Sequence, residues 1–359
     1  MRIVQSGGHD ISCNKVMIYF LRTSVFIVLL MSMVFVVSAQ TPMLFGLENN
    51  LSEVSEDLTA SRTMVIVNTK RRSIEWKDMS ESLHNSFKVM GIDPVFYAHY
   101  YDVNGSPDIR EGYLKFAKSR DVRFELMVVE KNEGFQMVIQ SLNETEEGTW
   151  FAQSESLNDL LLELARSLKR TDQKQQNFLV PSKPEYIEHL PLYIGNRQLN
   201  YPDRLKRLKL AVMKMPYADT SAGFELAKAY NKEVDNQNIL LDSAFSRYPY
   251  KVEVIPYQDE KGLSRKGYQY VLRYIHSSPE AIRSALGYPD EGLTEFMSQV
   301  VTPSGDRTLI NYSSDKRIYK WYVKQTVVGD VHVGRYWDAH EDFESSLRSF
   351  VSHMQQNFQ

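Results

Sequence analysis

Cysteine is almost absent from this sequence. The one cysteine among 359 residues is Cys13, which lies ahead of an N-terminal apolar run, whereas a lipoprotein cysteine would follow such a run. After removal of residues 1–39 no thiol remains, which excludes disulfides, cysteine nucleophiles and cysteine-bound metals. The chain therefore has to be stabilised by a hydrophobic core, and the 320 residues that follow Ala39 are enough for two domains of ordinary size.

The sequence also has none of the short motifs that mark common catalytic or nucleotide-binding sites. It contains no G-x-S-x-G, no H-E-x-x-H, no P-loop and no G-x-G-x-x-G. Ser313 and Lys316 have S-x-x-K spacing, but they fall in a predicted turn and no partner motif accompanies them. We therefore assign no catalytic, cofactor-binding or metal-binding residue and expect no cofactor, with an enzyme of unrecognised type as an alternative.

An excess of positive charge is missing as well. The formal charge of the chain is −3, and residues 1–39 carry three basic side chains and one acidic one, so the rest of the chain is near −5. Proteins that bind nucleic acid usually present a basic surface. We therefore expect no nucleic-acid partner.

The N-terminal segment has the three parts of a secretory signal peptide. Basic residues precede an apolar run of 13 residues, VFIVLLMSMVFVV, and small residues follow it. A membrane-spanning helix needs about 20 apolar residues, so the run predicts a leader and a mature chain without a transmembrane segment. We expect cleavage between Ala39 and Gln40, with an uncleaved anchor as the alternative and with Met1 or Met17 as the start. Export by the Sec route would place the protein in the periplasm, at the outer membrane or outside the cell.

The segment from residue 62 to residue 170 alternates between strand and helix patterns. Short apolar runs between turn residues predict strands, and apolar residues at helical spacing predict helices, with Ser106 and Ser156 as N-caps. The expected elements are strands at 63–68, 94–102, 123–131, 134–142 and 148–155, and helices at 74–91, 106–121 and 158–169. This β-α-β-α-β-β-β-α order indicates a mixed sheet with helices packed on it.

The rest of the chain divides into an arm, a linker and a second domain. Residues 40–61 are polar and predict an N-terminal arm, and residues 171–207 carry four prolines and predict a linker that lies along a surface. The second domain is expected over residues 208–359, with a hairpin turn at Gly329-Asp330 and a charged loop between its second and third strands. Its predicted strands are 208–215, 250–257, 267–276, 308–313, 318–327 and 331–339. Its predicted helices are 221–234, which continues or restarts through 238–247, then 278–287, 290–301 and the segment after Asp342.

Both domains are expected to end in three strands followed by a capped helix. Aligning the two ends at a shift of 186 residues places Ser156 on Asp342 and Leu161 on Leu347. Any two amphipathic helices after strands would align in this way, but the agreement of the preceding strand order favours a duplication. The expected fold is therefore α/β with mixed sheets: two tandem α/β domains of two or three layers, each of β-α-β-α-β-β-β-α order, after a cleaved signal peptide.

Three stretches of the first domain follow one another in a recognisable order: TMVIVN, then RFELMVVEKNEGFQMVIQSLNETEEGTWFAQSE, then LNDLLLELARSLKR. In this pattern residues 62–170 resemble the N-terminal domain of the periplasmic translocation protein TolB and the core of curli-secretion CsgG-like proteins. The third strand carries LMVVEK where those families usually have a glycine, and no β-propeller repeat follows. The resemblance implies an envelope protein that docks partners rather than an enzyme.

Tyrosine is concentrated in the second half of the chain, which holds 16 of the 21 tyrosines. Alternation along the predicted strand at 267–276 puts Tyr268, Tyr270, Tyr274 and His276 on one face. Such a face can stack on sugars or hold an extended peptide, because each ring offers apolar area and a hydroxyl. The alternative is that tyrosine simply suits half-buried strands.

Three residues on the last predicted strand share a face and suggest a metal site, but their spacing argues against one. His332 and His340 would lie about 26 Å apart at about 3.3 Å per residue, which leaves only Asp338 and His340 near one ion. Two ligands are too few for a structural metal. We therefore predict no metal here.

These observations favour a non-catalytic, exported envelope protein that acts through protein–protein binding. The expected partner is another envelope protein, whose identity and stoichiometry the sequence does not specify. A glycan- or peptide-binding protein that uses the tyrosine face is the second interpretation, and an enzyme of unrecognised type is the third.

Overall fold

The computed structural model describes residues 53–359 with short gaps. The residues outside the description are 1–52, 70–71, 132, 144–148, 175–178, 189, 191–195, 218–224, 247, 259, 289–294, 302–304 and 359. The predicted signal peptide, its cleavage site at Ala39 and Gln40, and most of the predicted arm therefore lie outside the described residues. Contacts group the described residues into one compact unit. Among the described residues, no helix combines the length and the apolar character that a membrane span requires.

A mixed five-stranded sheet is built from residues 62–154 in the order β2-β1-β3-β4-β5. Its strands are β1 (Arg62–Asn68), β2 (Asp93–His99), β3 (Val122–Lys131), β4 (Gly134–Ser141) and β5 (Thr149–Ser154). β1 is parallel to β2 and β3, whereas β4 is antiparallel to β3 and β5. The helices are α2 (Arg72–Val89), α3 (Tyr100–Val103), α4 (Pro107–Ser119) and α5 (Leu157–Arg170). This is the predicted order, except that residues 100–102, which we predicted as the end of the second strand, belong to the short helix α3.

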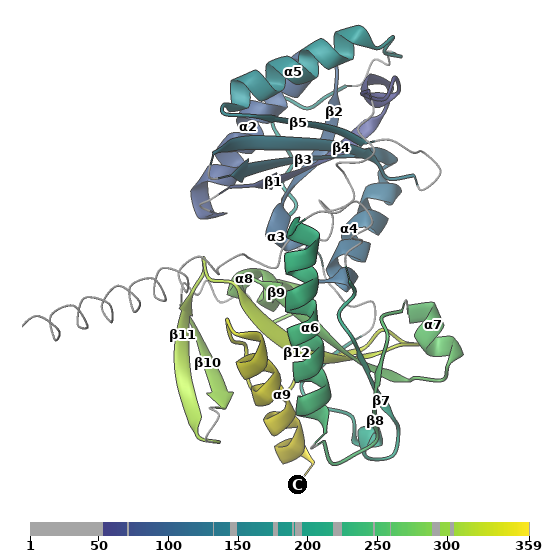
Figure 1. Ribbon diagram of the computed structural model, residues 1–359, viewed down its shortest axis with the longest axis vertical. Helices are drawn as coiled ribbons and strands as arrows, with labels where there is room; N and C mark the ends of the chain where they lie inside the picture. The colour runs from purple at the N-terminus through teal and green to yellow at the C-terminus, as the bar shows by residue number, and fades with distance from the viewer. Residues whose placement is uncertain are drawn as a thin grey trace, which may run out of the picture. The chain divides into compact units, whose positions relative to one another are not determined.

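Helices cover both faces of this sheet, with α2 and α5 together on one side (Figure 1). Alternate strand residues such as Val65 and Leu126 share a core with Leu83 of α2 and Leu164 of α5. The remaining strand residues, Met127 among them, pack with α4 in a second core. Burial thus follows the period of two along the strands and of 3.6 along the helices, which is why local patterns located these elements.

A second mixed sheet has six strands in the order β6-β13-β12-β9-β7-β8. Its strands are β6 (Arg197–Gln198), β7 (Leu210–Met213), β8 (Val252–Ile255), β9 (Tyr270–Ser277), β12 (Ile318–Gln325) and β13 (Val331–His332). β7 is parallel to β8 and β9, and β12 is antiparallel to β9 and β13. The helices of this half are α6 (Glu225–Phe245), α7 (Glu260–Arg265), α8 (Pro279–Ala285) and α9 (Phe343–Asn357).

Five strands of the second sheet repeat the topology of the first. In both sheets the first strand lies between the second and the third, and the fourth and fifth strands then follow in antiparallel pairs. In chain order α6 takes the place of α2, α7 that of α4, and α9 that of α5. The predicted α/β class with two mixed sheets is thereby confirmed. The division into domains at 62–170, 171–207 and 208–359, and the duplication itself, stay predictions.

A hairpin replaces the helix that we predicted over residues 290–301, so that prediction is wrong. The segment forms β10 (Glu295–Val301), which pairs antiparallel with β11 (Arg307–Ser313). Phe296, Ser298 and Val300 are buried while the residues between them are more exposed, which is a period of two. The buried hydroxyl of Ser298 donates to the carbonyl oxygen of Ala339 at 2.5 Å. Contacts with residues that are distant in the sequence therefore determine that this segment forms a strand and not a helix.

The predicted strand over residues 331–339 is wrong beyond the end of β13. Gly334 follows with a φ of +78°, and a Cβ at this position would lie 2.5 Å from the hydroxyl of Tyr201. This left-handed turn, which favours glycine, takes the chain out of the sheet. The chain next meets β12 at an isolated bridge between His340 and Tyr319.

One further expectation about the second half is corrected by the structure. The charged segment that we predicted as a loop before β9 contains α7, whose Leu263 is fully buried against β7 and β9. The sequence left open whether the helix predicted at 221–234 continues or restarts through 238–247, and in the structure it continues as the single helix α6.

The described part of the arm packs on the first sheet, whereas the described parts of the linker pack on both sheets, because the linker also contributes β6 to the second sheet. Tyr186 forms a parallel bridge with Tyr97 at the edge of β2, and the backbone N–H of Ile187 donates to the Tyr97 carbonyl at 2.8 Å. In the arm, Leu58 of the 3-10 helix η1 (Leu58–Ala60) joins the core under α2. A second 3-10 helix, η2 (Asp203–Lys206), leads from the linker into β7. These segments therefore belong to the packed structure.

Two glycines provide a paired test of this fold. Gly134 opens β4 with a φ of +102°, and an added Cβ would lie 2.2 Å from the backbone oxygen of Ser154, whereas Gly112 lies inside α4 with nothing within 4 Å of an added Cβ. We expect Gly134→Ala to lower the free energy of unfolding by about 1–3 kcal/mol. Gly112→Ala should raise it by about 0.5–1 kcal/mol because alanine is the better helix former. Urea unfolding followed by circular dichroism measures both, and equal effects would contradict the close approach at Gly134.

Candidate functional site

The residues of the predicted ligand face lie on β9 or directly before it. Tyr270 is buried, and Tyr268, Tyr274 and His276 are half-buried. Tyr270 and Tyr274 pack in the core formed with α6 and α9, and His276 stacks on Tyr319 with ring centroids 3.7 Å apart. Burial, aided by a nearby arginine, lowers the pKa of His276 well below its usual value. This face is thus largely covered, and ligand binding to it stays a prediction.

The residues that we weighed as metal ligands take separate partners. The Nδ1 atom of His332 lies 2.8 Å from the carbonyl oxygen of Asn200, and the backbone N–H of Asp342 donates to Nδ1 of His340 at 2.8 Å. Asp338 faces a lysine and a third histidine. Within the part of the chain that the structure describes, no group of three His, Cys, Asp or Glu side chains is arranged to hold a metal ion.

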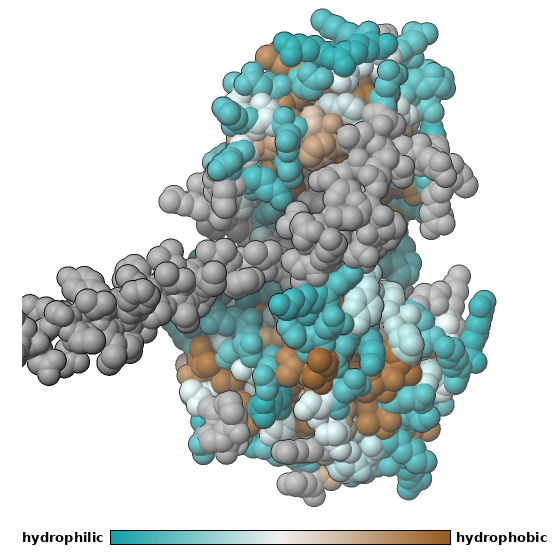
Figure 2. Space-filling view, viewed as in Figure 1, coloured by the Kyte–Doolittle hydropathy of each residue, from teal (hydrophilic) through white to brown (hydrophobic). Residues whose placement is uncertain are grey.

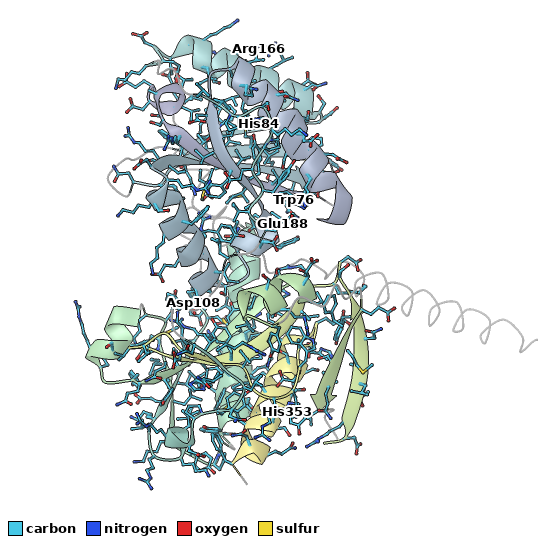
Figure 3. All side chains as sticks on the ribbon, turned by 180° about the vertical axis from the view of Figure 1, so that it is seen from behind. Trp76, His84, Asp108, Arg166, Glu188 and His353 are labelled. Carbon is cyan, nitrogen blue, oxygen red and sulfur yellow. The ribbon has the colours of Figure 1, made fainter. Side chains whose placement is uncertain are left out.

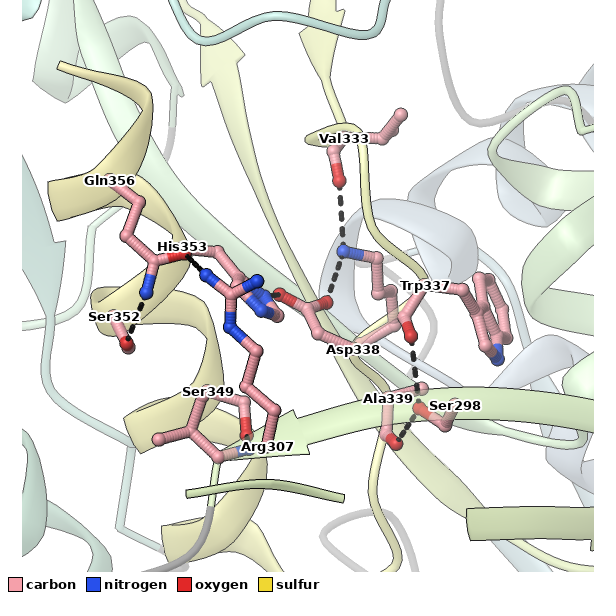
Figure 4. A network of polar contacts seen from close by, with 12 residues as sticks. Ser298, Arg307, Val333, Trp337, Asp338, Ala339, Ser349, Ser352, His353 and Gln356 are labelled. Atoms are coloured by element: carbon pink, nitrogen blue, oxygen red, sulfur yellow. Dashed lines mark hydrogen bonds and ion pairs between the residues drawn. The ribbon is translucent and has the colours of Figure 1, made fainter. Parts of the chain in front are cut away.

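A buried polar network joins β12 to α9 through the segment that follows β13 (Figure 4). Lys320 is 0 % exposed, and its Nζ donates to the Val333 carbonyl at 2.8 Å and to Oδ1 of Asp338 at 2.5 Å. Nδ1 of His353 lies 3.0 Å from the other carboxylate oxygen. Burial alone would raise the pKa of Asp338, but Lys320 and His353 outweigh burial and hold that pKa below its usual value.

In many enzymes with a nucleophilic side chain, an aspartate orients the histidine that acts as the general base. A catalytic role for His353 would therefore require that a substrate can reach its ring. Asp338 and His353 are 2 % and 3 % exposed, and the ring of Tyr336 lies over His353 with centroids 4.7 Å apart. Ser349, one turn earlier on α9, already bonds two backbone groups through its hydroxyl. We therefore assign the network a structural role, in which it fixes α9 against β12.

A shallow groove with an empty volume of about 890 Å³, open space included, runs between α2 and α5 on the outer face of the first sheet. Val89 and Leu162 lie in it and are 90 % and 52 % exposed. The other residues of the groove are Asn85, Ser86, Met90, Asn158, Leu161 and Ala165. The groove therefore combines apolar side chains with uncharged polar ones.

The corresponding face of the second sheet is closed. α6 and α9, which take the places of α2 and α5, contact each other directly, and Leu241 of α6 shares a core with Phe350 of α9. Tyr250 and Phe358 extend this core, with ring centroids 5.2 Å apart. In the described part of the chain, the open groove thus distinguishes the first sheet from the second.

Charged side chains lie on α5 beside the residues that line the groove. Arg166 lies on α5 at one end of the ribbon in Figure 3, and its guanidinium lies 3.7 Å from the carboxylate of Glu163. Hydrophilic residues cover most of the α5 surface seen in Figure 2, and apolar residues gather in separate patches over α6, α9 and β7. An apolar groove framed by charged side chains is typical of a binding site for an amphipathic segment.

The two exposed apolar residues of the groove were missed by the sequence analysis, although a signal existed. Leu160, Leu161 and Leu164 already fill the buried stripe of α5, so Leu162 is a leucine beyond what the stripe requires. Val89 carried no comparable signal, because it is the last residue of α2 and the pattern leaves its orientation open.

Comparison with known proteins identified no relative: no family model, no curated protein and no solved structure matches this chain. The resemblance of residues 62–170 to the N-terminal domain of TolB and to CsgG-like proteins therefore stays a prediction. The function has to be argued from the surfaces described above.

Proposed function

We propose that this chain is an exported envelope protein that acts by binding another protein through the groove between α2 and α5. The main support is the exposure of Val89 and Leu162 in a groove whose counterpart on the second sheet is closed. Apolar side chains gathered in an exposed groove are a common mark of protein interfaces. The N-terminal leader pattern supports export, and the resemblance to envelope docking domains supports the same role.

The proposed partner presents an amphipathic helix. The groove is walled by two helices, and a third helix that lies between them can bury residues at the spacing i, i+3, i+4 and i+7. Glu163 and Arg166 place charges of both signs along the α5 side. Such rim charges influence orientation and association rate more than affinity.

Site-specific photo-crosslinking in the envelope tests this proposal. A photoreactive amino acid at position 162 is expected to give one discrete adduct when the full chain, leader included, is expressed in a bacterial host. Ile239 is the matched control, because it is an apolar residue of α6 that is 65 % exposed and lies outside the groove. Sequencing the N-terminus of the same material checks export, with Gln40 as the expected first residue.

A second variant distinguishes specific binding in the groove from nonspecific binding to exposed apolar residues. With the photoreactive group at Ala165, the double substitution Val89→Asp and Leu162→Asp should abolish the adduct and leave the circular dichroism spectrum unchanged. Both substitutions replace exposed side chains, so we expect the free energy of unfolding to change by less than about 1 kcal/mol. Equal adducts from positions 162 and 239, or an adduct that survives the double substitution, would reject the groove as the binding site.

A further inference from the structure

Strand β11 (Arg307–Ser313) presents an exposed sheet edge. Among the described strands it pairs with β10 alone, and five of its seven residues are exposed. β10 lies between α9 and β11, so β11 is the outer strand of this hairpin (Figure 1). The edge is distinct from the groove between α2 and α5, and an interaction through it would be an addition to the proposed function.

A hydrogen bond on the far side of β10 shows which backbone groups of β11 are open. The N–H of Gln299 donates to the Trp337 carbonyl at 2.7 Å, away from β11, and Gln299 is paired with Leu309. In an antiparallel ladder, the two residues of a pair direct their N–H and C=O groups either toward each other or away from each other. Leu309 therefore directs both groups to the outer edge, and by alternation so do Arg307 and Asn311. In the described part of the chain, these groups of Leu309 and Asn311 have no hydrogen-bond partner.

The other sheet edges among the described strands are shorter or less exposed. β6 and β8 have only two and four residues, and the edge of β2 is bridged by Tyr186. β5 has six residues, of which only Gln153 is exposed. Natural edge strands are usually protected from pairing with another chain by charged residues, prolines or bulges. Apart from Arg307 at its start, β11 has no charged residue and no proline, so it can serve as a template for a further strand.

Apolar side chains lie beside this edge. Leu309 is 63 % exposed and Met297 is 64 % exposed. They are diagonal neighbours on the outer face of the hairpin, because Met297 is paired with Asn311. Ile310, at the middle of the strand, points to the opposite face and is half-buried, so it also retains accessible apolar area. Both faces of the strand can therefore bury apolar surface when a further strand is added.

We propose that β11 pairs with β11 of a second copy of this chain, antiparallel and centred on Ile310. In this register Arg307 lies opposite Ser313 of the second copy, and Leu309 lies opposite Asn311. The outward backbone groups of each strand then face those of the other, and the two hairpins form one four-stranded sheet across a two-fold axis. A shift of two residues in either direction would leave one end of each strand without a partner, so the centred register uses the whole length of β11.

The side chains favour a second copy as the occupant of this edge. Leu309 of each copy would lie diagonally across the axis from its counterpart, and the two Met297 side chains extend the apolar strip on either side. On the opposite face, Ile310 meets its counterpart directly. Arg307 and Glu295 carry opposite charges and lie at opposite ends of the outer face. Antiparallel pairing therefore places Arg307 of one copy about 10 Å, or two strand spacings, from Glu295 of the other, and no like charges are directly opposite each other.

Introduced cysteines test the register, because the chain has a single cysteine that Cys13→Ser removes. In that background, Ile310→Cys is expected to form a disulfide-linked dimer on mild oxidation, since residues directly opposite in a non-hydrogen-bonded pair have Cα atoms about 4.5 Å apart. Leu309→Cys should crosslink at least about fivefold more slowly, although Leu309 is the more exposed residue, because its counterpart lies diagonally at about 7–8 Å. Crosslinking of Leu309→Cys as fast as Ile310→Cys, or no dimer from either folded variant, would overturn the proposal.

Sedimentation velocity of the full chain tests the association itself. The sedimentation coefficient is expected to exceed that of one chain and to rise with concentration, because pairing of one edge strand buries less area than the roughly 1,200 Å² of the smallest stable interfaces. Leu309→Lys should return the coefficient to that of one chain, because lysine at an edge opposes pairing and the two lysines would repel each other across the axis.

A matched control shows whether the effect of the lysine is local. Val327→Lys introduces the same charge at an apolar residue that is 72 % exposed and lies outside the hairpin, so it should leave the association unchanged. The groove variant Val89→Asp with Leu162→Asp should also leave it unchanged, which separates this association from the proposed partner binding. A wild-type coefficient equal to that of one chain at every concentration would overturn pairing with a second copy, and so would undiminished association of Leu309→Lys.

Discussion

Replacing Asp338 by alanine is expected to lower the free energy of unfolding by about 3–5 kcal/mol. Lys320 is fully buried, and its ammonium group has the Asp338 carboxylate and the Val333 carbonyl as its partners in the network. Removing the carboxylate leaves a buried cation without a counter-charge, and it also removes the partner of His353. Urea unfolding of the purified chain measures the loss.

Two controls show whether the loss of stability comes from breaking the buried ion pair between Lys320 and Asp338. Asp203→Ala removes an exposed aspartate that lies 3.6 Å from Lys206 and should change stability by less than about 1 kcal/mol. Replacing both partners, Asp338→Leu with Lys320→Met, should recover a large part of the loss because no unpaired charge remains. A single substitution at Asp338 that costs no more than Asp203→Ala would contradict the network.

The same aspartate predicts a dependence of stability on pH. Although burial opposes it, the charge of Lys320 and the contact with His353 hold the folded pKa of Asp338 below its ordinary value of 3.8. A carboxyl with a depressed folded pKa adds stability above its unfolded pKa and loses that stability as the pH falls through the folded pKa. The wild-type chain should therefore lose stability below pH 3.8 more steeply than Asp338→Asn.

Replacing Asp108 by alanine should also cost about 3–5 kcal/mol, because it leaves Arg273 and Lys324 without this buried counter-charge. The three charged side chains come from α4, β9 and β12, so Asp108 links the first sheet's helix to the second sheet. Tyr322→Phe removes a single hydrogen bond to Asp108 and should cost only about 1–2 kcal/mol.

The position of Asp108 also predicts how the chain unfolds. A common hydrophobic core contains residues of α4 together with residues of β9 and β12. Asp108→Ala should therefore lower the unfolding midpoint of both sheets together, as followed by tryptophan fluorescence and by far-ultraviolet circular dichroism. A variant that shifts one transition and leaves a second one in place would show that the two sheets unfold separately.

Much of the secondary structure could be predicted because it is a local property. Ser106 and Ser156 are N-caps in the structure as predicted, and Ser278 and Asp342 are N-caps of the same kind. Each of the four accepts a hydrogen bond from a backbone N–H three residues later. Strand β10 was missed because Phe296 and Val300 also fit a helical stripe, whereas its partner β11 was predicted at 308–313. The strand character of β10 depends on pairing with β11 and on the buried contacts of Ser298.

The sequence by itself determined that residues 40–359 contain no cysteine, and it determined the apolar periods of most strands and helices and their caps. These features depend on residues within a few positions of each other. Only the tertiary structure decided that Arg273 meets Asp108, that Lys320 meets Asp338 and His353, and that α2 and α5 leave a groove where α6 and α9 close one. These contacts depend on which faces of the helices and strands pack together and exclude water. A local pattern specifies which face of an element is apolar, but it does not specify which element packs against that face.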